Sequence, residues 1–158
     1  MKAFVVNTLF AALTAGVLAL AAGAEDCVTF GKLAPAYAAD NDLDVRKMKV
    51  RFTPVDLARD GAERRAYLIS ELDDCSGRGD CDSTLYLSDE KKCYRPVLEF
   101  RGKWKGARAG TGRDLANVAI ESRFEGEAAG PKAGLLIERR LRTFEFDRKA
   151  GRYRETAK

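Results

Sequence analysis

The side chains best suited to acid–base chemistry gather in the middle of the chain. Residues 71–90 contain seven acidic residues against one basic residue. Two carboxylates held a few ångströms apart can act as the acid and the base of glycoside hydrolysis, so Asp73 and Asp82 are candidate catalytic residues. The simpler interpretation is that these carboxylates form the solvated tip of a hairpin. A small envelope glycan hydrolase is therefore an alternative function and not the leading one.

The chain contains no histidine. Histidine is the commonest metal ligand and a frequent general base, and Ser-His and Cys-His nucleophile pairs need it. No serine lies next to another obvious base, although the sequence leaves a Ser-Lys pair open. Residues 106–112 are rich in glycine but lack the Gly-Lys-Ser/Thr of a phosphate-binding loop, which favours a flexible turn. The sequence therefore indicates no cofactor and favours binding over catalysis.

Basic residues and one tryptophan follow the acidic segment. Residues 91–113 hold eight Lys and Arg residues against one acid, Glu99. Trp104 lies between two lysines, so its ring could stack on a sugar while the cations neutralise an anion. Charged residues also cover the outer face of ordinary strands and protect sheet edges. The candidate binding residues here are Lys103, Trp104, Lys105 and Arg108, with an anionic glycan or lipid as a candidate ligand.

Four cysteines form an even set, which predicts two disulfides in an exported chain. Cys75 and Cys81 enclose only five residues, two of them glycine, and such a span can turn tightly. We therefore predict the pairs Cys75–Cys81 and Cys27–Cys93 out of three alternatives. The spacing lacks a Cys-x2-Cys unit, which argues against a zinc site.

The tripeptide Arg78-Gly79-Asp80 lies inside the predicted cystine loop. Integrins bind this tripeptide, and a cystine loop would hold its guanidinium and carboxylate apart on a rigid turn. Turns also favour glycine and aspartate, so the triplet arises readily in an arginine-rich chain. Arg78 and Asp80 are therefore candidate binding residues at the tip of a cystine-closed hairpin.

A loop pattern precedes the acidic segment. The stretch Asp56-Leu-Ala-Arg-Asp-Gly-Ala-Glu-Arg-Arg-Ala-Tyr-Leu-Ile resembles the Asp-Leu-Asn-Gly-Asp-Gly-x-x-Asp loop of FG-GAP/VCBS-type β-repeats, which holds Ca²⁺ just before a strand. The resemblance extends over residues 56–100. Over these residues the chain is also similar to small exported bacterial proteins that pair this loop with a cystine hairpin. The resemblance implies a β-rich exported fold and not a particular activity.

The same loop departs from a Ca²⁺ site at the positions that bind metal. Ca²⁺ takes about six to eight oxygen ligands. Asp56 and Asp60 stand at the first and fifth positions, but Ala58 fills the third and Arg64 the ninth. We therefore expect the shape of the loop without a bound metal.

Residues 1–24 have the three parts of an export signal. Lys2 supplies a positive charge, an apolar run extends from Phe10 to Leu20, and Ala22-Gly23-Ala24 forms a small-x-small cleavage site. Membrane spans need about 20 apolar residues, and no later segment approaches that length. We predict cleavage after Ala24 and a mature chain of residues 25–158, either periplasmic or secreted, without a transmembrane segment.

Short strands must position these residues. Met48-Lys-Val-Arg-Phe alternates apolar and charged residues, which is typical of a half-buried strand. The segment 26–44 predicts a short strand at Cys27–Phe30, followed by a loop or one irregular helix. The series of short strands at short intervals along the chain predicts a mainly β fold. We expect an antiparallel meander that forms a sandwich, a rolled sheet or a propeller-like blade, with or without one short helix. Further strands are expected at Tyr67–Leu72, Thr84–Leu87, Tyr94–Phe100, Leu135–Leu141, 143–147 and 152–154, with Leu115–Ile120 forming a strand or a helix.

The whole chain is 46% hydrophobic and 33% charged, with a net charge of +4. This composition suits a single exported domain with a modest core. The predicted function is a non-enzymatic, monomeric binding domain. Its contact surface would be the Cys75–Cys81 hairpin and the adjacent basic strands. The partner would be a protein, such as a cell-wall enzyme, or an anionic envelope glycan or lipid, and not a nucleic acid.

Overall fold

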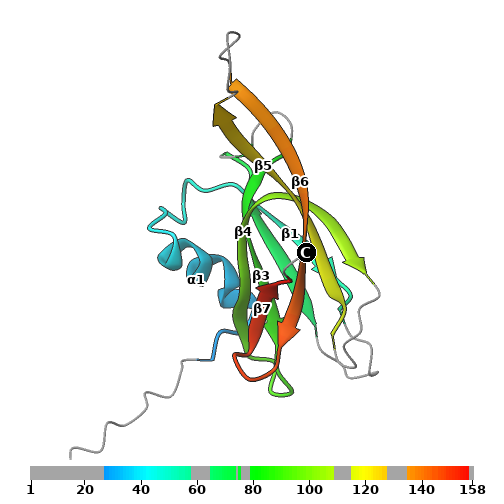
Figure 1. Cartoon of the computed structure of the whole chain (residues 1–158). Helices are drawn as coiled ribbons and strands as arrows, with labels where there is room; N and C mark the ends of the chain where they lie inside the picture. The colour runs from blue at the N-terminus through cyan, green and yellow to red at the C-terminus, as the bar shows by residue number, and fades with distance from the viewer. Residues whose placement is uncertain are drawn as a thin grey trace, which may run out of the picture.

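The computed structural model describes residues 27–57, 65–73, 75, 79–108, 115–127 and 135–156. The predicted signal peptide, Asp60 and Arg78 lie outside these residues. Within them, seven strands form one antiparallel sheet in the order of the sequence (Figure 1). The predicted mainly β meander is confirmed. The strands are β1 (Val50–Val55), β2 (Ala66–Glu71), β3 (Cys81–Ser88), β4 (Tyr94–Arg108), β5 (Asn117–Glu127), β6 (Leu135–Asp147) and β7 (Arg152–Glu155).

A short helix covers the outer side of the first strands. The 3-10 turn Phe30–Lys32 leads into α1 (Leu33–Asp40), which packs against β2, β3 and the start of β4 (Figure 1). The hydroxyl of Tyr86 on β3 lies 3.3 Å from the Asp40 carboxylate, and burial together with this carboxylate raises the pKa of the phenol. The strand expected at Cys27–Phe30 is reduced to one bridge, between Val28 and Tyr94, because the chain turns into the helix directly afterwards.

The middle strands are buried on both faces. On one face, Leu68 and Leu85 join the core that packs against β5, β6 and β7. On the other face, Ile69 and Tyr86 join the cluster beneath α1. Successive side chains of a strand point to opposite faces, so strands covered on both faces are apolar nearly throughout. The strand expected at Tyr67–Leu72 is present as β2 and is of this kind.

β4 differs most from the expectation. It extends to Arg108, beyond the expected end at Phe100, and takes in the start of the predicted glycine-rich turn. Its first half pairs with β3 and its second half pairs with β5, and the change of partner occurs at Gly102. Gly102 has φ +151°, and a Cβ at this position would lie 2.7 Å from the carbonyl oxygen of Glu121. β4 curves as it passes from its pairing with β3 to its pairing with β5 (Figure 1).

The C-terminal strands close over the core. The segments expected as separate strands at Leu135–Leu141 and 143–147 form one strand, β6. β7 follows through a turn that contains Gly151 with φ +64°, and it contacts β4. The buried hydroxyl of Tyr153 donates a 2.8 Å hydrogen bond to the carbonyl of Ala116.

Both predicted disulfides are present. Cys75–Cys81 closes the hairpin between β2 and β3. Cys27–Cys93 ties the segment before α1 to the turn between β3 and β4. Among the described residues, no helix is long and apolar enough to cross a membrane.

Candidate binding surface

The pairing of β3 with β4 places the cystine hairpin beside the basic half of β4. Cys81 lies directly opposite Gly102, and Asp82 lies opposite Arg101. The Arg101 guanidinium donates a 2.8 Å hydrogen bond to the Asp82 carboxylate. The two segments predicted to form one contact surface are therefore neighbours in the sheet.

Cations from three adjacent strands lie on the same side of the sheet. Lys103 on β4 is directly opposite Glu121 on β5, and Glu121 is opposite Leu141 on β6. Because side chains alternate along a strand, residues two positions away from these share their face. Lys105 sits at the register shift of β4 and reaches the same face, since its Nζ lies 2.8 Å from Glu121. We call the resulting set the outer basic face: Arg101, Lys103, Lys105, Arg123 and Arg139.

Glu121 lies at the centre of the outer basic face. Its carboxylate interacts with Lys105 at 2.8 Å and with Arg139 at 3.3 Å. The hydrogen bond from Lys105, supported by that from Arg139, lowers the pKa of Glu121. Two carboxylates, those of Glu121 and Asp82, lie among the five cations. Glu99 and Glu145 lie further along the same strands. The outer basic face therefore keeps an excess of positive charge.

Trp104 does not share the face of its neighbouring lysines. It pairs with Ile120, packs against the core, and its ring lies 6.2 Å from that of Phe100. The expected surface that combines this aromatic ring with Lys103 and Lys105 is therefore not assembled, because odd and even positions of β4 face opposite ways. Arg108, the last residue of β4, is exposed.

The integrin-type display of the cystine loop is not supported at Asp80. This residue directly precedes β3 and is only 6% exposed. Recognition of the tripeptide would need its carboxylate in solvent. Arg78, the other half of that prediction, lies outside the described residues.

The candidate catalytic carboxylates are each close to a different cation. Asp73 lies 3.6 Å from Lys49, and Asp82 is bound by Arg101. Asp56 is exposed directly after β1, while its expected partner Asp60 lies outside the described residues. In the part of the chain that the structure describes, no three Cys, Asp or Glu side chains are grouped as metal ligands.

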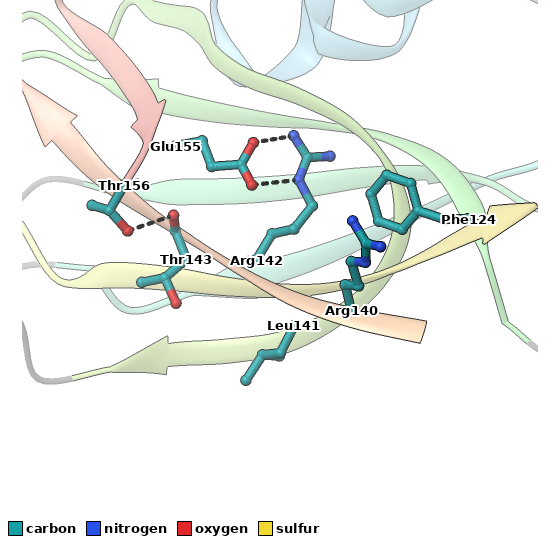
Figure 2. Close-up of a pocket in the computed structure, with 7 residues that line it drawn as sticks. All are labelled: Phe124, Arg140, Leu141, Arg142, Thr143, Glu155 and Thr156. Carbon is teal, nitrogen blue, oxygen red and sulfur yellow. Dashed lines mark hydrogen bonds and ion pairs between the residues drawn. The ribbon is translucent and has the colours of Figure 1, made fainter. Parts of the chain in front are cut away.

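A cavity that the sequence did not predict lies where β7 ends. It has a volume of about 630 Å³ and opens along β6 (Figure 2). Arg142 donates two hydrogen bonds to Glu155, at 2.9 and 2.6 Å, which lower the pKa of that carboxyl. The guanidinium of Arg140 lies 5.1 Å from the centre of the Phe124 ring. The run of arginines in β6 was visible in the sequence, but the cavity was not. It is lined by Phe124, Arg140, Leu141, Arg142, Thr143, Glu155 and Thr156.

We compared the chain with known protein families, with curated proteins and with solved structures, and none of them matches it. The resemblance to FG-GAP/VCBS-type repeats therefore stays a prediction.

Proposed function

We propose that the protein is a non-enzymatic binding protein of the periplasm or the extracellular space, which docks on an acidic surface of a partner protein. The contact surface is the outer basic face together with the adjacent cystine hairpin. The observation that carries the proposal is the grouping of five cations from three paired strands around two carboxylates. The two disulfides fit an oxidising compartment.

A rigid scaffold supports this use of the outer basic face. The cations project from paired strands and not from loops, and the disulfide Cys75–Cys81 holds the neighbouring hairpin. A surface that is ordered before binding loses less conformational entropy when the complex forms. Complementary charge also steers association and selects acidic partners over basic ones.

The alternative functions draw less support from the geometry. Stacking on a sugar would require Trp104 beside the lysines, but its ring packs towards the core. The candidate catalytic carboxylates Asp73 and Asp82 lie beside Lys49 and Arg101, as carboxylates in ordinary surface ion pairs do. A protein surface, which offers many carboxylates to a broad basic face, fits the arrangement better.

Neutralising the outer basic face is expected to weaken binding to an acidic probe. Each exposed ion pair contributes up to about 1 kcal/mol, so the variant Lys103→Gln/Lys105→Gln should bind fluorescent poly-L-glutamate about tenfold more weakly at low ionic strength. Fluorescence anisotropy measures the dissociation constant. Added salt should reduce the difference between the dissociation constants of the variant and the unmodified protein, because salt screens exposed charges.

The matched control removes the same charge elsewhere. Arg148 and Lys149 are exposed in the turn between β6 and β7, so Arg148→Gln/Lys149→Gln should bind the probe nearly as well as the unmodified protein. Equal losses in the two variants would refute a localised surface. Tighter binding to a heparin oligosaccharide or to phosphatidylglycerol vesicles than to poly-L-glutamate would replace the protein partner by a glycan or a lipid.

A further inference from the structure

β6 continues well beyond the end of its neighbour β7. β7 pairs with Phe144–Asp147, and the N–H of Thr156 then donates a 2.9 Å hydrogen bond to the carbonyl of Thr143. From there β6 runs on to Leu135, paired with β5 on its other side. Among the described residues, no strand lies beside this open edge of β6.

The direction of the backbone groups follows from the bond at Thr143. In an antiparallel ladder, the N–H and C=O of alternate residues point to the same edge of a strand. Because the Thr143 carbonyl points towards β7, the backbone groups of Leu141, Arg139 and Ile137 point to the open edge. The backbone groups of the residues between them, Glu138 and Arg140, point to β5. Three donors and three acceptors are thus aligned beyond the last bond to β7.

The side chains beside this edge form two different surfaces. Arg140 and Arg142 lie on the face of Phe124, which is 39% exposed. Ile137, also 39% exposed, lies with Leu141 on the opposite face. The cavity at the end of β7 marks the start of the edge (Figure 2). A strand added here would therefore meet two guanidinium groups on one face, and on the other face the aliphatic side chains of Ile137 and Leu141 with Arg139 between them.

We propose that the edge of β6 from Ile137 to Leu141 is a strand-addition site for an extended acidic segment of a partner protein. Such a segment continues the sheet in the direction of β7 and alternates Asp or Glu with Val, Ile or Leu. Its main chain supplies the ladder bonds and its side chains supply the selectivity. This site shares Arg139 with the outer basic face, but it binds through the edge-facing backbone of β6 and does not depend on the function proposed for that face.

Charge complementarity selects an acidic occupant over a second copy of the chain. The segment from Ile137 to Arg142 carries three arginines and one acid, Glu138. A second β6 paired with this edge would bring the same three arginines against it, and like charges opposite each other destabilise strand pairs. Arg140 and Arg142 already interact with Glu138 and Glu155, but a guanidinium has five N–H donors and can accept further carboxylates.

Hydrogen exchange of the intact protein tests the site directly. The probe is a short peptide that alternates Glu or Asp with Val or Leu. At saturation it should slow exchange of the Ile137, Arg139 and Leu141 amides at least about tenfold, since these are the amides that gain partners. The amides of Glu138 and Arg140, which point to β5, should change little.

Two control peptides separate strand addition from simple charge attraction. A peptide of the same sequence, N-methylated at every second residue on the ladder side, keeps its charge but loses its donors and should give no protection. A version with Lys in place of Asp and Glu should not bind. Equal protection by the N-methylated peptide, or no protection by the acidic one, would overturn the proposal. Protection that rises with protein concentration in the absence of peptide would also overturn it, because it would assign the edge to a second copy.

A pair of variants at Leu141 provides an independent test. Leu141→Pro removes the edge-facing N–H without removing a bond to β5, and proline is tolerated on edge strands. Leu141→Ala removes the same side chain but keeps the N–H. The proline variant should bind the acidic peptide about tenfold more weakly than the alanine variant. Equal affinities of the two variants, with unchanged circular dichroism, would contradict the site. If the proline variant does not fold, the exchange experiment on the unmodified chain decides.

Discussion

Replacing Cys27 and Cys93 by serine is expected to lower the free energy of unfolding by about 4 kcal/mol, because a disulfide restricts the unfolded chain more when it closes a longer loop. These cysteines are 66 residues apart in the sequence. The bond also fastens the segment before α1 to the turn that precedes β4, so its loss should loosen the cluster beneath the helix. Urea unfolding followed by circular dichroism measures the change.

The second disulfide provides the matched control. Cys75 and Cys81 are only six residues apart, and the same chain-entropy argument gives about 2 kcal/mol for Cys75→Ser/Cys81→Ser. The first double variant should therefore unfold at a clearly lower urea concentration than the second. Equal midpoints, or a greater loss from the short loop, would show that loop length does not determine the stability here.

Replacing Gly102 by alanine is expected to destabilise the fold by about 3 kcal/mol, through strain and overpacking together. Its φ of +151° disfavours a side chain, and the added Cβ would lie 2.7 Å from the Glu121 carbonyl oxygen and 3.0 Å from Ile120. The clash with a backbone atom cannot be relieved by a rotamer change. The strands on either side would have to separate, and this would move Lys103 away from Glu121.

The same substitution at Gly106 separates the effect of the steric clash from the effect of the positive φ. Gly106 also has a positive φ, +113°, but no described atom lies within 4 Å of the position of its added Cβ. Gly106→Ala should therefore cost only about 1 kcal/mol. Thermal unfolding of both variants measures the difference. A loss at Gly106 equal to that at Gly102 would contradict the role assigned to the close approach of β4 and β5.

Much of the fold could be predicted because its signals are local. Alternation of apolar and charged residues indicated a strand at Met48–Phe52, and the short span between Cys75 and Cys81 favoured the correct disulfide pairing. The extent of β4 could not be predicted, because glycines such as Gly102 and Gly106 are typical of turns and not of strand interiors. Only the pairing with β5 shows that the strand continues beyond Gly102.

The candidate surface was predictable in part. Lys103 and Lys105 were recognised as neighbours, but their separation from Trp104 depends on the face that each residue takes in the part of β4 that pairs with β5. Arg123 and Arg139 join these lysines through the register of β5 and β6, which involves residues far apart in the sequence. The open edge of β6 was not predictable, because a strand pattern does not say where the neighbouring strand ends.

A map of backbone amide chemical shifts during titration with poly-L-glutamate tests the outer basic face most directly. We expect the largest changes at the five residues of the outer basic face, on β4, β5 and β6, and in Cys81 and Asp82 beside them. We expect small changes in the turn at Arg148 and Lys149, which carries comparable charge. Changes centred on that turn, or spread evenly over all exposed cations, would contradict the assignment of the outer basic face as the contact surface.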